Sequence, residues 1–410
     1  MTTIEMSSKQ SRAVDFVRLG LSRFLLSRVL KDCRLHISCA ATGTELTAGR
    51  GPQELGIRIA DPKVMWRITI DPDPGAGELF MDGKWDITKG DLGAFVTMMA
   101  RNYQRLLSGP LRVLWIWTLR KDLGVHRWDP EASCRNVQHH YDIGDDLYEL
   151  MLDEGMVYSC AFFDRPEMPL REAQINKLRT TIRRLGIGPG MRVLDIGCGW
   201  GEACRTIAAE TGAATVHGIT LAENQFNTAI ERSSHDAHPP EYFLADYREH
   251  AARHPQAYDR ILSIGMFEHV GDTNYRAYFA AVRDQLCPGG KALVHTIMNA
   301  TNAAGGTINS VWLQRHIFPG GRIPDLVDEM LDAAAKEGLI PDCPPYLQPP
   351  SDYAETLRRW RANFCRNLGR LDSQRYDDRF RRMWLFYLAM CEAMFDGCGF
   401  QVGQVVFRKR

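Results

Sequence analysis

The sequence has no excess of either charge, since its 410 residues include 50 lysines and arginines and 50 aspartates and glutamates. Nucleic-acid-binding proteins usually carry a basic surplus, so we predict no nucleic-acid partner. Residues 1–12 lack the apolar core of a signal peptide, and no run of about 18 apolar residues occurs anywhere. We therefore predict that no segment spans a bilayer and that any membrane substrate is reached from the surface.

Paired cysteine motifs are also absent. The eleven cysteines are scattered along the chain without a C-x-x-C pair, so we predict no metal site. Their number is odd and the chain is long, which favours reduced thiols and a cytoplasmic protein. Hydrophobic residues make up 45% of the chain and charged residues 24%, a composition typical of a folded protein of two domains.

Residues 1–125 form the first predicted domain. A helical stretch over 11–30 leads to short alternating segments such as 64–70. The apolar segment 111–119 contains two tryptophans and is followed by two basic residues. That composition suits either an interfacial membrane segment or a helix buried against another domain. We interpret this region as an N-terminal lipid- or membrane-docking domain, followed by a polar linker over 126–136.

Residues 137–410 form the predicted catalytic domain, in which helical segments alternate with short apolar strands. This rhythm predicts an α/β fold with a parallel sheet covered by helices on both faces. The strand candidates are 192–196, 214–219, 258–263 and 291–297.

The most specific local motif is VLDIGCGWG at 193–201, an apolar strand that ends in three glycines at alternate positions. Glycine allows a sharp turn and a close approach of backbone to ligand, and open parallel sheets bind ligands beyond such strand ends. The pattern around Asp195, Gly197 and Gly199 resembles the first motif of class I methyltransferases, which implies S-adenosylmethionine. The alternative is a plain tight turn between strand and helix.

Many such enzymes carry an acid at the end of the second strand to bind the ribose, and this sequence departs from that pattern. Thr220 and Gln225, or else Glu223, must take part of that role. Asp246 and Tyr247 follow the next strand and are predicted to flank the adenine, with a surface loop as the alternative.

Several further segments resemble the cyclopropane-fatty-acid synthase family, which includes the mycolic acid cyclopropane synthases. The resemblance implies a class I methyltransferase doubly wound sheet with a lipid-binding cap, at about 301–350, preceded by a smaller α+β N-terminal domain. It extends from about residue 60 to the C-terminus, and the segment 77–86 matches the longer phospholipid-type members. The other matching segments are 137–148, 156–162, 218–225, 263–271, 311–324 and 352–360.

The resemblance implies a reaction at the cis double bond of unsaturated phospholipid acyl chains. The alkene takes the methyl of S-adenosylmethionine, which leaves a carbocation on the chain. A bound bicarbonate then removes a proton from the new methyl, and a cyclopropane ring closes. Such a site must align methyl and alkene and exclude water. The family also suggests a homodimer that associates peripherally with the inner face of the membrane.

By matching motifs, the bicarbonate site would use Cys160, Glu268, His295, Ile297 and Tyr353. Cys160 and Ile297 would act mainly through backbone groups, whereas the other three would hold the ion by hydrogen bonds. The residue before Tyr353 is an aspartate where relatives often have histidine. For the cofactor, the resemblance implies that His140 and Tyr141 line the site and that Tyr158 and Ser159 close over it.

Each of these residues also has a plainer interpretation. Cys160 alone would be a buried apolar thiol, Glu268 a first-turn helix acid, His295 a core histidine and Tyr353 an amphipathic aromatic. Tyr158, Phe267, Tyr353 and Trp360 could stabilise a cation through their ring faces, although Phe267 and Trp360 suit a plain core cluster equally well.

Other functions remain open within and beyond the family. Some relatives leave a methyl or methylene branch, and some methylate amines, a reaction that needs no bicarbonate. A non-catalytic lipid-binding homologue would be expected to lose the glycine loop or the bicarbonate set, and the sequence retains both. We therefore predict cyclopropanation.

Overall fold

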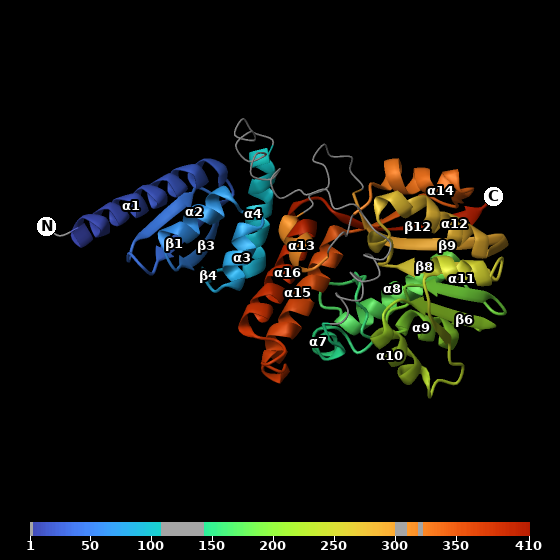
Figure 1. The fold of residues 1–410 in the computed structure, drawn as a ribbon. Coiled ribbons are helices and arrows are strands. Elements are labelled where there is room, and N and C mark those ends of the chain that lie inside the picture. The colour runs from blue at the N-terminus through green and yellow to red at the C-terminus, as the bar shows by residue number, and fades with distance from the viewer. Residues whose placement is uncertain (1–2, 108–142, 300–309, 319–322) are drawn as a thin grey trace. The chain divides into compact units, whose positions relative to one another are not determined.

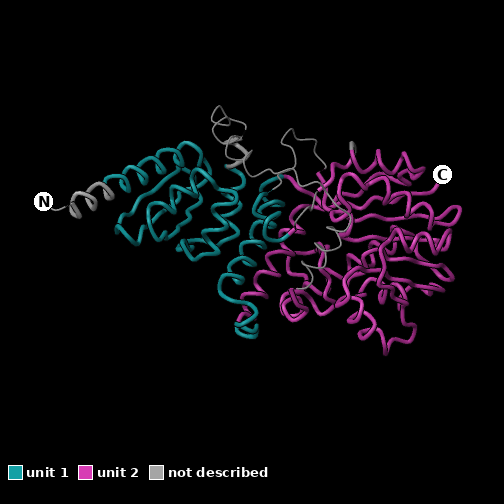
Figure 2. Tube along the Cα trace, in the orientation of Figure 1, with its two compact units in different colours: residues 1–125, 309–317, 369–398 teal, residues 126–308, 318–368, 399–410 magenta. Residues whose placement is uncertain are grey.

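The computed structural model describes residues 3–107, 143–299, 310–318 and 323–410. The backbone packs into two compact units (Figure 2). The first contains residues 1–125, 309–317 and 369–398, and the second contains 126–308, 318–368 and 399–410. Packing thus groups two segments of the predicted catalytic domain 137–410, residues 309–317 and 369–398, with the N-terminal region. The assignment of 137–410 to one functional domain stays a prediction.

The first unit contains a four-stranded sheet in the order β2-β1-β3-β4. β1 pairs with β3 in parallel, and the other pairs are antiparallel. The predicted helical stretch at 11–30 is present as part of α1, and the mixture of helices and sheet agrees with an α+β unit. Its elements are α1 (Thr3–Val29), β1 (Cys33–Cys39), β2 (Glu45–Gly49), β3 (Gln53–Ile59), α2 (Pro62–Ile70), α3 (Gly75–Met81), β4 (Trp85–Lys89), α4 (Leu92–Leu107), α13 (Val311–His316) and α16 (Asp378–Gly397).

The alternating segment 64–70 forms the helix α2 instead of an extended segment. The Asp61 carboxylate accepts hydrogen bonds from the backbone N–H of Lys63 at 2.7 Å and of Val64 at 3.3 Å, which caps the helix. Pro62 occupies the first helical turn, where its missing N–H costs nothing. The start signal at residues 61 and 62 thus outweighs the period-two pattern that follows it.

A half-buried aspartate fixes α13 to the turn before α3. Asp73 accepts hydrogen bonds from the Ser310 hydroxyl at 3.1 Å, Val311 N at 3.0 Å and Trp312 N at 2.9 Å. The last two donors belong to the first turn of α13, where backbone N–H groups have no partner within the helix. This contact explains why residues 309–317 belong to the first unit.

Replacing Asp73 with alanine is expected to lower the free energy of unfolding by about 2–3 kcal/mol, because it leaves buried backbone donors without an acceptor. Denaturant unfolding followed by tryptophan fluorescence would measure the loss. Asp86→Ala is the matched control, since Asp86 pairs with Arg382 at the surface and should contribute less than about 1 kcal/mol. Equal losses in the two variants would contradict this assignment.

The second unit contains an eight-stranded sheet in the order β10-β12-β9-β8-β5-β6-β7, with β11 paired to β12. The five strands from β9 to β7 are parallel, and β12 continues the sheet beside β9 as an antiparallel strand. All four predicted strands are present, as β5, β6, β8 and β9. The strands are β5 (Arg192–Ile196), β6 (Thr215–Thr220), β7 (Glu241–Leu244), β8 (Tyr258–Ile264), β9 (Leu286–Met298), β10 (Leu339–Pro341), β11 (Tyr346–Gln348) and β12 (Gln401–Lys409).

Helices cover both faces of this sheet (Figure 1). Leu194 and Val193, neighbours on β5, belong to different apolar clusters, as expected for side chains on opposite faces of a strand. One cluster includes residues of α12 and α14, and the other includes residues of α8, α9 and α10. The helices are α7 (Asp145–Met151), α8 (Leu170–Leu185), α9 (Glu202–Glu210), α10 (Glu223–Ser233), α11 (Tyr247–Arg253), η1 (Phe267–His269), η2 (Asp272–Asn274), α12 (Tyr275–Gln285), η3 (Leu326–Leu331), α14 (Asp332–Lys336), α15 (Pro350–Asn367) and η4 (Leu368–Arg370).

The predicted cap at about 301–350 falls partly outside the described residues, as does the apolar segment 111–119. In the described part of the cap, Leu326, Met330 and Leu339 pack into the sheet's core. Within the described ranges, no helix has the length and apolar character needed to cross a bilayer.

Candidate active site

A pocket lies beyond the carboxyl ends of β5, β6, β7 and β8, with an empty volume of about 1250 Å³ that includes its open mouth. The glycine turn after β5 forms part of its wall. Gly197 has φ of +82°, and a Cβ there would lie 2.9 Å from Met266. Only glycine meets both conditions without strain, which accounts for its place in the motif.

The pocket brings together the predicted cofactor residues that the structure describes. His140 and Tyr141 lie outside the described residues. Glu223 is exposed and absent from the lining, so Thr220 and Gln225 are the better candidates for the ribose. The nine residues in the lining are Tyr158, Ser159, Asp195, Gly197, Gly199, Thr220, Gln225, Asp246 and Tyr247.

Thr220 and Gln225 act as a pair, because the Thr220 hydroxyl donates to Gln225 Oε1 at 2.9 Å and both side chains are buried. Asp246 caps α11 by accepting from Arg248 N at 2.8 Å, and it also accepts from the Arg248 guanidinium. Burial raises the pKa of Tyr247 to about 12, so its phenol stays neutral. Asp246 and Tyr247 therefore stand at a helix start in the pocket wall, with the surface-loop alternative disfavoured.

Asp195 and Lys177 place two opposite charges in the interior of the pocket. Asp195 is buried, and Oδ1 has no hydrogen-bond partner within the described residues. Burial raises the pKa of Asp195 to about 7, and the Lys177 charge opposes that rise. Burial also lowers the pKa of Lys177 to about 8, although nearby carboxylates, Asp153 first, act in the other direction.

Lys177 and Gln174, one turn apart on α8, hold the loop that carries Tyr158 and Ser159. Lys177 Nζ donates to the Ser159 hydroxyl at 2.8 Å. Gln174 Nε2 donates to the carbonyl oxygens of Ser159 at 2.8 Å and Val157 at 3.2 Å. Both side chains are fully buried, so the loop is fixed by polar contacts that water does not screen.

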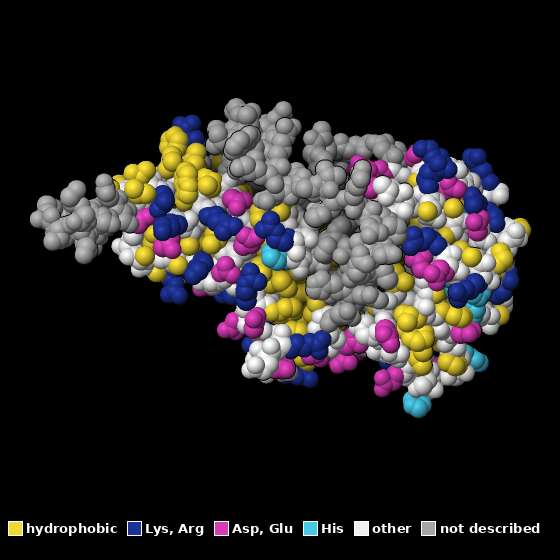
Figure 3. All heavy atoms as spheres, in the orientation of Figure 1, with side chains coloured by type: hydrophobic (Ala, Val, Ile, Leu, Met, Phe, Trp, Pro, Cys, Tyr) yellow, Lys and Arg dark blue, Asp and Glu magenta, His cyan; other side chains and the backbone are white. Residues whose placement is uncertain are grey.

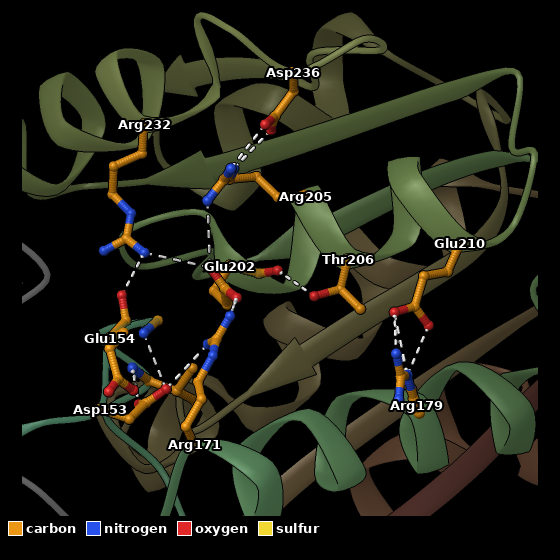
Figure 4. Close-up of polar contacts among 12 residues, drawn as sticks. Asp153, Glu154, Arg171, Arg179, Glu202, Arg205, Thr206, Glu210, Arg232 and Asp236 are labelled. Atoms are coloured by element: carbon orange, nitrogen blue, oxygen red, sulfur yellow. Dashed lines mark hydrogen bonds and ion pairs between the residues drawn. The ribbon is translucent and has the colours of Figure 1, made fainter.

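An ion-pair network fixes the start of the same loop to α9 (Figure 4). Glu202, in the pocket wall at the start of α9, pairs with Arg171, with Arg205 at 3.6 Å and with Arg232 at 3.4 Å. Arg171 also donates to Asp153 at 3.0 Å. Asp153 in turn accepts from the backbone N–H of residues 155 and 157, so one carboxylate orders the loop and anchors it to α8.

Asp145, at the start of α7, ties the motif at 137–148 to the glycine turn. Its carboxylate accepts from Trp200 Nε1 at 3.2 Å, Asn224 Nδ2 at 2.7 Å and the Thr228 hydroxyl at 3.1 Å. Trp200 follows Gly199 in the pocket lining. Asp145 therefore gives this motif a structural role in positioning the pocket.

The predicted bicarbonate residue Glu268 lies on the short helix η1, directly before the pocket residue His269. Glu268 Oε1 accepts from Ile297 N at 2.7 Å, which brings two members of the predicted set into contact. None of the described residues supplies a partner for the buried Oε2. Burial raises the pKa of Glu268, and the Ile297 N–H opposes the rise.

His295 lies on β9, and its backbone carbonyl accepts from the pocket residue Gly265 at 2.9 Å. The ring is buried against Phe162 and contacts Gln404 Nε2 through Nδ1 at 3.2 Å. Burial holds the pKa of His295 well below its usual range, with the Lys177 charge adding to the effect. His295 is therefore a neutral imidazole at physiological pH.

Cys160 follows the pocket residue Ser159 and is buried. Its thiol donates to the Ala161 carbonyl at 3.3 Å, and burial raises its pKa well above the usual range. It is a thiol rather than a thiolate, so a nucleophilic role is excluded at neutral pH. The expectation that Cys160 acts through its backbone stays a prediction.

Tyr353 lies on α15, which hydrogen bonds hold to the loop after Cys160. Ala161 N donates to the Thr356 hydroxyl at 3.1 Å, and Phe163 N donates to Asp352 at 3.2 Å. The aspartate that departs from the family pattern thus anchors this loop. Aromatic contacts link Tyr353 to the pocket residue Tyr158. The ring centroid of Trp360 lies 6.2 Å from that of Tyr353 and 5.1 Å from that of Tyr158.

Phe267 differs from the other aromatic candidates. It is fully buried and packs on Tyr275 and Phe279, with ring centroids 4.6 Å and 5.5 Å away. These contacts favour the core interpretation for Phe267. Trp360 is equally buried, but its contact with Tyr158 keeps it beside the pocket wall.

Comparison with known proteins identifies the family. Residues 129–405 match the model of the mycolic acid cyclopropane synthetase family. The chain belongs to this family. The cyclopropane-fatty-acyl-phospholipid synthase of Escherichia coli is 32% identical over 362 residues, covering 88% of this chain and 89% of that protein. The tuberculostearic acid methyltransferase UfaA1 of Mycobacterium tuberculosis is 31% identical and covers 96% of each chain.

Solved structures of family members support the same assignment. Mycolic acid cyclopropane synthase CmaA1, complexed with SAH and CTAB, superimposes with a TM-score of 0.61 at 31% identity, covering 67% of this chain and 98% of that one. The M. tuberculosis cyclopropane synthase MmaA2 gives 0.60 at 31% identity, with the same coverage of both chains. The predicted fold and the predicted class, an S-adenosylmethionine-dependent C-methyltransferase, are confirmed.

Several residues that shape the pocket were not singled out from the sequence alone. They include Lys177, Asp145, Asp153 and Glu202. Asp145 stood within a recognised motif and could have been found there. Lys177 and the ion pairs carried no local signal, because lysines, arginines and acids are normally assigned to the surface. Their positions depend on how α8, α9 and α10 pack.

Proposed function

We propose that this protein is a cyclopropane-fatty-acyl-phospholipid synthase, which adds a methylene group from S-adenosylmethionine to the cis double bond of unsaturated phospholipid acyl chains. At the coarser level, its relatives carry out cyclopropane formation or methyl transfer on lipids. The phospholipid substrate is supported by the E. coli relative, which matches across both units of this chain.

The residues of the pocket fit S-adenosylmethionine, which when bound supplies an electrophilic methyl group. The glycine turn lets the backbone approach the ligand closely, and Asp195 offers a buried oxygen that requires a donor. Thr220 and Gln225 offer hydroxyl and amide groups for a ribose. Lys177 would face the carboxylate end of the molecule, while Tyr158 and Ser159 would close over it.

The predicted catalytic set also fits a bicarbonate ion, which would supply the base. Glu268 keeps one oxygen on Ile297 N–H and has a second oxygen that would accept the ion's hydroxyl. Neutral His295 and the Tyr353 phenol can donate to it. The Ile297 N–H donates to Glu268 and the Ile297 carbonyl accepts from the Thr296 hydroxyl at 3.2 Å, so Ile297 would act through Glu268 and not on the ion directly.

The chain's own groups must also protect a cationic intermediate on the lipid. Tyr158 and Tyr353 could face such a cation with their rings, and Trp360 would hold both rings in place. Cys160 is protonated, so it does not offer a thiolate that would trap the cation. Ring closure is faster than capture of the cation by water only when water is excluded from the pocket.

The observation that carries this proposal is the Glu268 carboxylate, buried beside a methyltransferase pocket with one oxygen bound and the other unsatisfied. A simple test incubates the purified protein with S-adenosylmethionine, bicarbonate and dioleoyl phosphatidylglycerol, followed by lipid mass spectrometry. We expect each modified chain to gain one CH₂ group and to take up no hydrogen on mild hydrogenation. A product that takes up hydrogen would overturn ring closure.

A second candidate is a lipid C-methyltransferase that leaves a methyl or methylene branch. The similarity to UfaA1 over 96% of both chains favours it. The same experiment separates the two, since a methylene branch has the mass of a ring but takes up hydrogen. A saturated methyl branch carries two more hydrogens than a ring and would form only if a hydride donor were added to the assay. A non-catalytic lipid-binding homologue would bind the cofactor without consuming it.

The pH dependence of cofactor affinity provides a further prediction. Because the pKa of Asp195 is raised to about 7, this carboxyl is protonated below that pH and cannot hold the cofactor's ammonium group. We expect the Kd for S-adenosylmethionine to rise about tenfold between pH 8 and pH 6. Calorimetric titration would measure it.

Asp195→Asn should flatten that pH profile and weaken binding throughout. Two other groups in the lining do not account for this loss of affinity at low pH. Burial lowers the pKa of His269 to about 4, below this range, and Lys177, with a pKa of about 8, gains a proton as the pH falls, which would strengthen its hold on a carboxylate. An unchanged profile in Asp195→Asn would show that another group controls it.

The remaining expectations concern location and assembly. We propose peripheral association with the inner face of the membrane, as a lipid substrate requires, and a homodimer as the family suggests. Sedimentation analysis of the full chain tests the second.

A further inference from the structure

The outer face of α1 carries a stripe of exposed apolar side chains, which Figure 3 shows gathered over this helix. Val14, Val17, Leu21 and Phe24 are 48%, 63%, 42% and 52% exposed. Their spacing of three and four residues places them on one side of the helix. Phe16, beside the stripe, is 77% exposed.

The opposite side of α1 packs against α2 and β2. Leu19, Ser22 and Leu30 are buried there, at 3%, 0% and 4% exposure. The stripe therefore faces away from the core of its own unit. Among the described residues, only Ile230, Leu244 and Tyr346 are other large apolar side chains with high exposure, and they lie in the other unit.

The charges in the C-terminal half of this helix and just beyond it are basic, and the acidic Asp15 before them pairs with Arg18 at 3.0 Å. Residues 16–31 include four basic side chains and no acidic one. Arg28 lies over the Phe24 ring at 4.5 Å, on the same side of the helix as the stripe. Apolar rings combined with basic side chains suit the boundary between lipid headgroups and acyl chains, where the phosphates are anionic. Over residues 13–29, a second copy of the helix would offer these arginines one acid, Asp15, which already pairs with Arg18.

We propose that the outer face of α1 inserts into the interfacial layer of an anionic phospholipid bilayer. Val17, Leu21 and Phe24 enter the acyl boundary, and Arg28 reaches the phosphates. The proposal rests on the proposed function in that a phospholipid substrate requires the enzyme to dock on a membrane. The docking surface is the outer face of α1, and vesicle binding tests it without any need for turnover.

The test is flotation of the full-length protein with vesicles that contain phosphatidylcholine and phosphatidylglycerol. The double variant Val17→Ser with Phe24→Ser is expected to bind at least about tenfold more weakly than wild type, since both side chains lose contact with the acyl boundary. Arg28→Glu should lose a similar factor and weaken the preference for phosphatidylglycerol. Ile230→Ser with Leu244→Ser, equally exposed in the other unit, is the control and should bind like wild type.

Two further measurements separate the alternatives. Turnover on detergent-dispersed phospholipid should remain close to wild type in all the α1 variants, which shows that they fold. Wild-type flotation by the α1 variants would overturn the proposal. A dimer that becomes monomeric in lipid-free buffer on the same substitutions would also overturn it, because a second copy would then cover the stripe. Wild-type protein that floats but never turns over would count against the proposed function alone.

Discussion

Replacing Glu268 with glutamine is expected to abolish product formation while the affinity for S-adenosylmethionine changes by less than about threefold. The amide can still accept from Ile297 N–H through its oxygen, so the fold around η1 should survive. The second oxygen becomes an NH₂ group, which cannot accept the hydroxyl of a bound bicarbonate. Losing a positioned base costs on the order of a thousandfold in rate. Cyclopropane product and S-adenosylhomocysteine are both measured, with calorimetry for the cofactor.

The matched control is Glu210→Gln, which removes a surface carboxylate that pairs with Arg179 at the end of α9. It should retain full turnover. Release of S-adenosylhomocysteine without ring product in Glu268→Gln would place the role of Glu268 after methyl transfer, as expected for a residue that holds the base. Turnover like wild type would remove Glu268 from the mechanism and leave the bicarbonate assignment without its main support.

Local sequence patterns were sufficient to predict those parts of the site that consist of one strand and the turn after it. The motif at 193–201 predicted β5, the positive-φ glycines and the pocket beside Asp195, because strand, turn and helix are consecutive in the chain. The family resemblance supplied Glu268 and Ile297, which are far apart in sequence and meet only because β8 and β9 pair.

Other features required the tertiary structure. The segment 64–70 alternates like a strand, yet Asp61 and Pro62 start a helix there. The grouping of α13 and α16 with the first unit depends on non-local contacts, such as those of Asp73 with Ser310 and Trp312. The burial of Lys177 could not be predicted, because a lysine on an amphipathic helix is normally solvated and becomes buried only when several carboxylates surround it.

Lys177 supports the second large expected effect. Lys177→Met keeps the length and apolar stem of the side chain but removes the ammonium group that donates to Ser159 and lies near Asp195. If Lys177 faces the carboxylate of S-adenosylmethionine, the variant should bind the cofactor at least about tenfold more weakly, the loss expected for one buried charge-assisted hydrogen bond. Calorimetry measures the Kd, and the unfolding temperature is measured in parallel.

The effect of Lys177→Met on the stability of the fold should be opposite to its effect on cofactor affinity. The pKa of Lys177 falls from 10.5 to about 8 in the folded protein, so folding disfavours the ammonium form. That cost is fully present below pH 8, shrinks between pH 8 and 10.5, and corresponds to roughly 3 kcal/mol at neutral pH. Removing the charge should therefore keep or raise the unfolding temperature at pH 7, even though the nearby carboxylates lose a counter-charge.

Lys177→Met should also move the pH profile of cofactor binding. Without the ammonium group, the pKa of Asp195 rises further, so weakening of affinity should begin at a higher pH than in wild type. Lys336→Met, which removes a surface lysine paired with Asp332, is the control and should leave both the profile and the Kd unchanged. A purely structural Lys177 would give the reverse pattern, a lower unfolding temperature with an unchanged Kd and an unchanged profile, and would show that the cofactor carboxylate is held by other groups.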